Sequence, residues 1–406
     1  MRRSAVGAIA AQGAQALASF VLQVAVAHAL GLHGLGAFAI LYGVVVLASG
    51  TITGFVGDSL VVLDRRDRRM RAGLEQGALL LAAGAGTLAA VATTLLGLTD
   101  AGTGALFALA IVAFCLEEVV RRLLMAELRF WRVAAIDFVG LLVALGVLGV
   151  AAALGALSLA AFVAALAIGQ TVAMLAGMAA LPAEERFLVP LRGGSLRAVA
   201  AYGVWRSLQQ FLRPALLTAV RTAVGVVAGL SATGLLEAGR VYVAPALLLV
   251  SGLSSYLFAS FARERDRPLP ERLRRSDRAV AALLGVTVAI GLVALLLLPV
   301  AGPLLFSARP QPIAVLGWLA YTASVAAVTP YGALAAVSGG QAVVFGVRVA
   351  DTALSLAAVM VGLSLGLDPA WSAALLAVGS LAGGLVLRFA LVPRLERTPD
   401  LVPEPA

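Results

Sequence analysis

The chain has no lysine, a single cysteine and little charge overall. Charged residues make up 13% of its 406 positions, and all 30 basic residues are arginine. A soluble globular protein carries roughly twice this share of charged residues, so the composition excludes an ordinary soluble fold. Cys115 has no second cysteine with which to form an internal disulfide. The only two histidines, His28 and His33, have no matched carboxylates nearby, so no metal site is expected.

Apolar residues dominate instead. They make up 61% of the chain, and the mean hydropathy is +1.01. A membrane-spanning helix needs roughly 20 mostly apolar residues, because hydrocarbon offers no partners to the backbone polar groups. Apolar runs of this length predict about twelve helices near residues 5–30, 35–62, 74–98, 104–123, 133–154, 158–180, 199–228, 234–261, 279–301, 313–337, 346–366 and 370–392. The expected fold class is an all-α polytopic membrane protein.

The first of these runs resembles a signal peptide at its edges, with Arg2-Arg3 before it and Ala27-His28-Ala29 near its end. It is too long for a signal core, and glutamines interrupt it. We therefore interpret it as the first transmembrane helix.

The connections between the apolar runs alternate in charge. One set is short and almost uncharged, with Arg309 its only basic residue. The other set carries arginine clusters: Arg65, Arg66, Arg68, Arg69 and Arg71; Arg121, Arg122, Arg129 and Arg132; Arg186, Arg192 and Arg197; and Arg263, Arg265, Arg267, Arg272, Arg274, Arg275 and Arg278. Basic connections stay on the cytoplasmic side of a membrane. This pattern predicts a multi-pass protein of the cytoplasmic (inner) membrane with both termini in the cytoplasm. The net charge of +9 then reflects topology and contact with membrane lipids, and no nucleic-acid partner is expected.

The two halves of the chain resemble each other. A shift of 198 residues lays Gly31-Leu32 on Gly229-Leu230 and Gln12 on Gln210, and many transporters are built from such repeats. An even number of helices separates the copies, so the repeats run parallel. The sequence thus predicts two pseudo-symmetric six-helix lobes around a central cavity. Their expected bounds are 1–182 for the N-terminal lobe, 183–198 for a cytoplasmic linker, 199–393 for the C-terminal lobe and 394–406 for a cytoplasmic tail.

Two apolar helices carry polar stripes. On the seventh, Arg206, Arg213 and Arg221 recur at intervals of seven and eight, which keeps them near one face. Charge at membrane depth is costly, so such a stripe usually faces a cavity or a partner. Glutamines accompany it on the seventh helix and form a similar stripe on the first: Gln209 and Gln210, and Gln12, Gln15 and Gln23. These eight side chains are the candidate substrate-binding residues.

A second interpretation of the arginines is structural. Arg206 could extend to the interface, while Arg213 and Arg221 could pair with Asp58, Glu237 or Asp351. Asp58 has no local basic partner before Arg65, which makes it a candidate for ion coupling, as is Glu237.

Other charged residues have helix neighbours of opposite sign. Glu237 and Arg240 are three residues apart, as are Arg348 and Asp351. Glu117 and Glu118 stand four residues before Arg121 and Arg122, and these pairs are expected to be bridges at the membrane interface. Asp137 near the start of the fifth helix can also reach an interfacial arginine.

No residue pattern indicates an enzyme. The sequence has no P-loop or other glycine-rich phosphate motif. Its outer connections are too short for the substrate domain that membrane glycosyltransferases need. Neither catalysis nor a cofactor is expected.

Several segments resemble the polysaccharide-biosynthesis or O-antigen flippases of the multidrug/oligosaccharidyl-lipid/polysaccharide (MOP) superfamily. The turn Leu30-Gly-Leu-His-Gly-Leu-Gly-Ala-Phe38 is similar to that family's Leu-Gly-x-x-x-Tyr-Gly-x-Phe turn. The segments at Gly229–Leu235, Arg240-Val-Tyr242, Leu257–Ala262 and Glu127–Asp137 are similar to its helix 7 to helix 8 region and its fifth helix. Leu35 departs from the family's tyrosine, and the seventh helix lacks the family's aspartate. Twelve helices rather than fourteen argue against the lipid II flippase branch.

The resemblance implies that a polyprenyl-diphosphate-linked oligosaccharide is moved from the inner to the outer leaflet by alternating access. Glycan polymerase or glycosyltransferases would then be partners. Arg213 and Arg221 would engage the diphosphate, Arg206 would receive it near the cytoplasmic mouth, and the glutamines would contact sugar hydroxyls. The alternatives are a MOP-type exporter of a drug or another small molecule, whose cavity should carry carboxylates for cationic substrates, and a non-transporting membrane scaffold of glycan synthesis.

Overall fold

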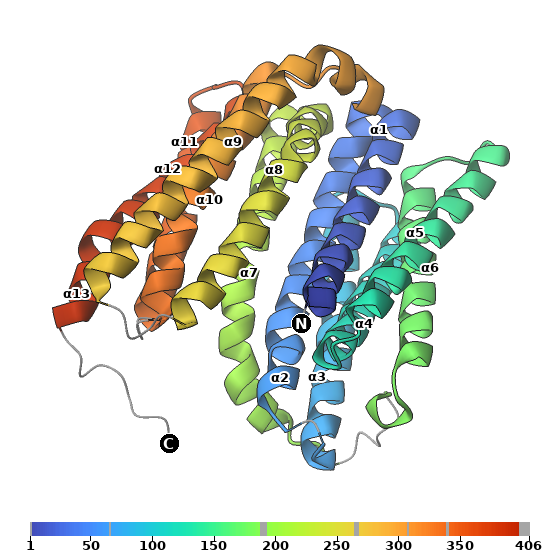
Figure 1. Cartoon of the computed structure of the whole chain (residues 1–406). Coiled ribbons are helices and arrows are strands. Elements are labelled where there is room, and N and C mark those ends of the chain that lie inside the picture. The colour runs from blue at the N-terminus through green and yellow to red at the C-terminus, as the bar shows by residue number, and fades with distance from the viewer. Residues whose placement is uncertain are drawn as a thin grey trace. The chain divides into compact units, whose positions relative to one another are not determined.

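A computed structural model describes residues 2–64, 66–186, 193–263, 268–306, 308–337 and 341–397. Within these ranges the chain is helical and contains no strand (Figure 1). The elements are α1 (Arg2–Ile52), η1 (Thr53–Gly57), α2 (Ser59–Val62), α3 (Arg68–Leu95), α4 (Ala101–Ala126), α5 (Phe130–Ala153), α6 (Leu159–Ala180), η2 (Ala183–Glu185), α7 (Leu196–Ala228), α8 (Leu230–Arg263), α9 (Leu269–Phe306), α10 (Pro312–Val337), α11 (Gln341–Ser364), η3 (Pro369–Trp371), α12 (Ser372–Leu385), η4 (Val386–Leu391) and α13 (Val392–Arg397). Most of the expected tail and part of the expected linker lie outside the described residues.

The helices match the expected spans. Ten helices in the described ranges are long and apolar enough to cross a membrane, and the first of them, Ala10–Gly57, is 48 residues long. It contains two limbs that join at Gly31, whose φ of 65° and ψ of −167° interrupt the helix. A positive φ of this kind favours glycine, because a side chain would crowd the following carbonyl. α1 contributes two limbs to one candidate, and α8, which is not among the ten, spans 34 residues. The all-α polytopic fold class is confirmed.

The outer surface is consistent with a lipid solvent. Large apolar side chains such as Leu88, Leu296 and Phe389 are exposed on the helices. A soluble protein buries most residues of this type, whereas lipid tails are as apolar as leucine. α9 is 38 residues long and exceeds a single crossing, and its first turns carry Arg272, Arg274, Arg275 and Arg278.

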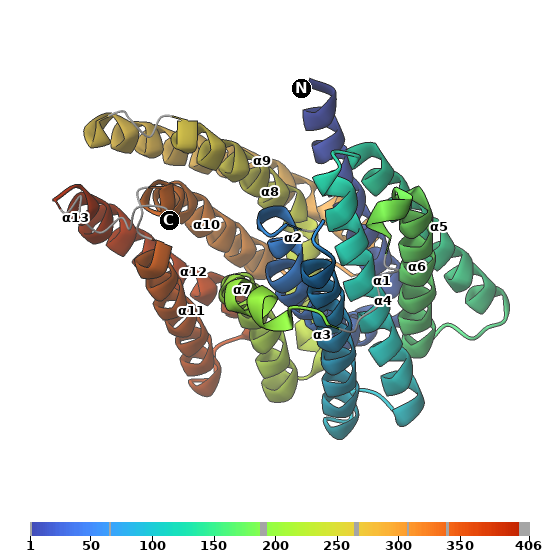
Figure 2. The same ribbon diagram turned by 90° about the horizontal axis from the view of Figure 1, so that it is seen from below.

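The chain divides into two compact units, residues 1–218 and 219–406. In the first unit α4 packs on α3 and α6, while α1 packs on α5 (Figures 1 and 2). In the second unit α10 is central and contacts α8, α9 and α12. The division falls within α7, after the residues 183–198 expected as a linker. Whether the functional lobes follow the expected bounds stays a prediction.

The N-terminal half of α7 is fixed to the first unit through glycines. A Cβ added at Gly54 would lie 2.6 Å from the backbone of Arg206, and one at Gly203 would lie 2.6 Å from the backbone of Phe55. Only glycine allows two backbones to approach so closely. The Ser207 hydroxyl also donates a hydrogen bond of 2.8 Å to the Thr51 carbonyl. Together these contacts hold α7 against the end of α1 and against η1, a π-helix, and π-helical turns are frequent at functional sites.

Candidate functional site

Arg206 and Asp58 form an ion pair in the first unit. The Arg206 Nε donates to Asp58 Oδ2 at 2.9 Å, and its Nη2 lies 2.8 Å from the same oxygen. The Nη1 group donates to Gln209 Oε1 at 3.0 Å. The side chains are 36% and 20% exposed. Asp58 therefore pairs with Arg206, whereas the sequence suggested Arg213 or Arg221 as its partner.

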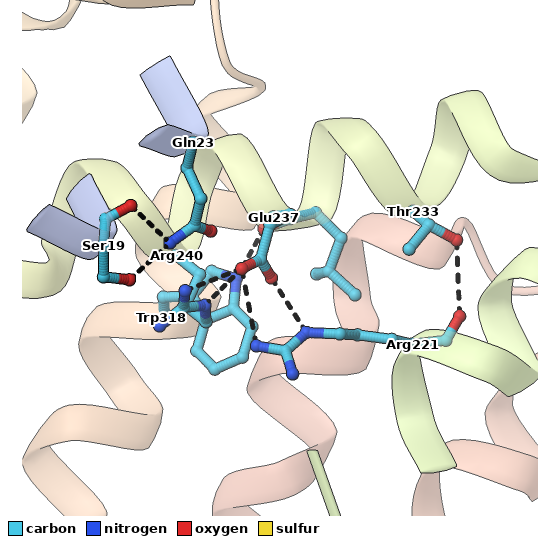
Figure 3. A network of polar contacts seen from close by, with 8 residues as sticks. Ser19, Gln23, Arg221, Thr233, Glu237, Arg240 and Trp318 are labelled. Carbon is cyan, nitrogen blue, oxygen red and sulfur yellow. Dashed lines mark hydrogen bonds and ion pairs between the residues drawn. The ribbon is translucent and has the colours of Figure 1, made fainter. Parts of the chain in front are cut away.

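A second cluster lies in the other unit, where Glu237 on α8 accepts hydrogen bonds from two arginines (Figure 3). Arg221 Nε donates to Glu237 Oε2 at 3.0 Å, and Arg240 Nε donates to Glu237 Oε1 at 2.7 Å. Thr233 ties α8 to α7, since its hydroxyl donates to the Arg221 carbonyl at 3.3 Å. The expected pair of Glu237 and Arg240 is confirmed.

This Arg221–Glu237–Arg240 group, here called the cationic cluster, holds two guanidinium groups against one carboxylate. Glu237 is 1% exposed, and the Arg221 side chain is 10% exposed. One guanidinium group balances the charge of the one carboxylate. Counted over these three side chains alone, the net charge is therefore +1. Burial of an excess charge in a membrane-spanning region is costly without a compensating anion or water.

A third group, the acidic cluster, surrounds Arg121 in the first unit. Arg121 is 1% exposed; its Nη1 donates to Glu118 Oε2 at 2.9 Å, and its Nε lies 3.1 Å from Asp137 Oδ1. Glu117 lies 3.7 Å from Arg121, and Arg122 donates to Glu118 at 2.8 Å. The expected pairs of Glu118 with Arg122 and of Glu117 with Arg121 are present, and packing of α4 against α3 and α6 buries Arg121 and both glutamates within the protein. Their expected place at the membrane interface stays a prediction.

The acidic cluster has the opposite charge balance from the cationic cluster, because three carboxylates face two guanidinium groups. Thr53 in η1 donates its hydroxyl hydrogen to Glu118 at 3.2 Å, which joins the π-helix to the cluster. Two buried carboxylate atoms, Glu117 Oε1 and Asp137 Oδ2, have no hydrogen-bond partner within the part of the chain that the structure describes. Orphaned acceptors of this kind are rare in buried sites unless they serve a function or bind a small molecule.

A small pocket adjoins the acidic cluster. Its lining comes from the first unit alone and consists of Gln15, Ala18, Ser19, Leu22, Tyr42, Phe114, Glu117, Asp137, Leu166 and Gln170. About 30 Å³ is open to the centres of water-sized molecules. This is enough for water, whereas drug-sized ligands need pockets of roughly 300 Å³ or more. The pocket thus suits a proton carried by water better than a sugar or a drug.

The remaining predicted site residues occupy different environments. Gln12, Gln210 and Arg213 are exposed, while Gln15 is half-buried in the pocket beside the acidic cluster. Gln23 is buried, and its amide donates to the Ser19 carbonyl and hydroxyl at 3.2 and 3.0 Å (Figure 3).

The expected arginine stripe is divided by the packing. Arg206 and Arg213 belong to the first unit and Arg221 to the second. Ion pairing, the alternative interpretation of Arg221, is confirmed by its contact with Glu237. Arg206, which that interpretation extended to the interface, pairs with Asp58. Substrate contact by these residues stays a prediction.

The acidic cluster was missed as a site. Its signal was present in the sequence as two adjacent glutamates four residues before two adjacent arginines, all within an apolar helix. Helical spacing could reveal the local pairs but not the approach of Asp137 from α5.

Comparison with known proteins gives matches in structure only. No protein-family model matches the sequence, and no relative is found among curated proteins. An inward-facing multidrug resistance MATE family transporter of the MOP superfamily superposes with a TM-score of 0.72 at 14% identity, covering 95% of this chain and 96% of that one. A MATE protein in complex with MaL6 gives 0.67 at 12% identity, with 97% and 95% covered. A MOP superfamily transporter from Pyrococcus furiosus, described as having a binding pocket of reverse polarity that suggests a different function, gives 0.63 at 12% identity, with 97% and 95% covered. At these identities the similarity shows the fold, and the chain has the fold of the MATE transporters of the MOP superfamily.

Proposed function

We propose that the protein is a transporter that moves a polyprenyl-diphosphate-linked oligosaccharide across the cytoplasmic membrane for cell-surface polysaccharide synthesis. The cationic cluster carries this proposal. Its two guanidinium groups share one carboxylate, so a diphosphate would add anionic acceptors for both. Arginine suits this ligand, because its planar fork donates paired hydrogen bonds to phosphate oxygens.

Glu237 has a positioning role in this scheme. Its two carboxylate oxygens hold Arg221 and Arg240 from two different helices at fixed distances of 3.0 and 2.7 Å. A carboxylate between two cations also lowers the cost of burying them before substrate arrives. Glu237 therefore pre-organises the phosphate site, which is a different role from the ion coupling considered for it from the sequence.

Arg206 and Arg213 are suited to an earlier step. Arg206 is partly exposed and already paired with Asp58, so an incoming phosphate competes with that carboxylate for the guanidinium group. Arg213, seven residues further along α7, is exposed. We assign to these two arginines the capture of the lipid phosphate, and to the exposed Gln12 and Gln210, with Gln209, contact with sugar hydroxyls.

Gln15 and Gln23 fit this role less well. Gln23 donates its amide hydrogens within α1, and Gln15 lines a pocket of water size.

The acidic cluster is the proposed coupling site. With all of its groups ionised it holds one buried negative charge in excess, and uptake of a single proton removes that charge. The pocket beside the cluster has the size of water, so we assign the coupling to a proton carried by water. Thr53 in η1 donates to Glu118, and Asp58 follows directly after η1. A shift of η1 on protonation of the cluster would therefore move Asp58 relative to Arg206 and change their ion pair.

The two alternative functions account for fewer observations. An exporter of cationic drugs needs excess carboxylate in a pocket of drug size, and the excess carboxylate here adjoins a pocket of water size. A membrane scaffold needs no buried group with an unbalanced charge. The Pyrococcus furiosus transporter supports the view that pocket polarity, rather than the MOP fold, distinguishes functions.

The test is transport by protein reconstituted in liposomes. A polyprenyl diphosphate carrying a short glycan is supplied in one leaflet, and an impermeant lectin reports its arrival in the other. Arg240→Gln leaves the neutral pair of Arg221 and Glu237 intact, so the variant folds, but transport should fall at least tenfold. Arg348→Gln is the matched control, because it breaks a pair of the same spacing in the same unit, with Asp351 at 3.4 Å, and keeps transport. Full transport by Arg240→Gln contradicts the proposal.

A further inference from the structure

The second unit has another pocket, formed where three of its turns converge. The lining residues are Ala228, Ala232, Leu235, Leu236, Gln311, Asp368, Pro369 and Ala370. They come from the ends of α7 and α8, from the connection before α10 and from η3. About 260 Å³ is open to water-sized molecules. This is just below the roughly 300–1,000 Å³ of drug-sized sites, so the pocket fits a ligand of about one ring.

The pocket has an apolar wall and two polar groups. Alanine, leucine and proline side chains supply the wall. Asp368 is held in place because its Oδ1 accepts the Ala370 backbone N–H at 2.8 Å, which leaves the carboxylate oriented by the start of η3. The Gln311 side chain makes no polar contact with any residue that the structure describes, so its amide can both donate and accept.

This combination selects among ligand classes. A phosphate would be repelled by the Asp368 carboxylate. An organic ammonium would donate to the carboxylate and to the Gln311 amide oxygen but would leave the Gln311 NH2 group without an acceptor. A sugar ring uses all the groups present, because its C–H face packs on the apolar wall while its hydroxyls donate to the carboxylate and exchange hydrogen bonds with the amide.

The pocket lies next to the cationic cluster along α8. Leu236 lines the pocket and Arg240 belongs to the cluster, so about 6 Å of helix rise separates the two positions. Trp318 fixes this part of α8, since its indole N–H donates to the Leu236 carbonyl at 2.8 Å. The turns that form the pocket carry no basic residue other than Arg309, which assigns them to the outer side on the predicted topology.

We propose that this pocket is a carbohydrate site that holds one neutral sugar ring on the outer side of the second unit. Its assignment to the exported glycan rests on the proposed function, whereas its affinity for a neutral sugar does not. A ring held here, beside the cationic cluster, extends recognition from the lipid phosphate to the glycan.

The experiment measures binding of a panel of neutral methyl glycosides to the purified full chain by titration calorimetry. At least one glycoside should bind in the millimolar range, and Gln311→Leu should weaken it at least fivefold. Ala232→Phe fills the pocket and should abolish binding. Ser231→Phe is the matched control, because Ser231 is the exposed neighbour that does not line the pocket, and it should keep the wild-type affinity.

Two results overturn the proposal: no glycoside binds the folded wild type, or Ala232→Phe binds as well as Ser231→Phe. A third result also overturns the proposal: the wild type binds tetramethylammonium but no glycoside, and Asp368→Asn abolishes the binding of tetramethylammonium. The pocket would then be assigned to amines. Arg240→Gln separates the two proposals, since it should lose transport and retain glycoside binding. If no glycoside binds while the wild type still transports the lipid-linked glycan, this inference is refuted and the proposed function is not.

Discussion

Replacement of Arg121 by methionine is expected to destabilise the protein strongly. The guanidinium group of Arg121 is 1% exposed and faces Glu117, Glu118 and Asp137 at 3.7, 2.9 and 3.1 Å. Methionine fills a similar volume but leaves the three carboxylates without their central cation. Removing one partner of a buried ion pair costs about 3–5 kcal/mol, a large part of a typical stability of about 5–15 kcal/mol.

The assay is thermal aggregation of detergent-purified protein, followed by size-exclusion chromatography with fluorescence detection. At about 2 °C per kcal/mol, a loss of about 3 kcal/mol lowers the midpoint by about 6 °C. Arg122→Met is the matched control, because Arg122 is 34% exposed and its one ion pair among the described residues is with Glu118, so the pair contributes about 1 kcal/mol or less. Equal midpoints for the two variants would refute the reasoning.

Asp137→Asn tests the charge balance of the same cluster. It leaves two carboxylates opposite two guanidinium groups, so stability should be retained while the pH dependence of transport is lost. A variant with unchanged pH dependence would remove the acidic cluster as the coupling site.

Three further predictions concern packing, capping and topology. Gly54→Ala should lower the thermal midpoint, because its Cβ would lie 2.6 Å from the Arg206 backbone; an unchanged midpoint would show that α7 can shift freely. The Thr103 backbone N–H and hydroxyl donate to Asp100 at the start of α4 and lower the pKa of its carboxyl group below 3.8. The stability that this helix cap contributes is present above pH 3.8 and is lost as the pH falls through the lowered pKa. Asp100→Ala should therefore flatten the dependence of stability on pH in the acid range. A fluorescent protein fused to the C-terminus should fluoresce and an alkaline phosphatase fusion should be inactive, since both termini are predicted to be cytoplasmic; the reverse result contradicts the topology.

The helical architecture followed from the sequence because it depends on local properties. Length and hydropathy of each run decide whether a segment can span a membrane, and neither depends on other segments. Ion pairs between helix neighbours were equally accessible, as for Glu237 with Arg240 and Arg348 with Asp351, because helix geometry fixes side chains three or four residues apart.

The partners and burial of the polar residues depended on the tertiary structure. Asp58 meets Arg206 only because Gly54 and Gly203 let α7 approach η1, and Arg221 meets Glu237 only because α8 turns back along α7. Arg121 became a core residue because α4 packs against α3 and α6. A helix sequence shows which residues share a face, but the neighbouring helices decide whether that face meets lipid, water or another charge.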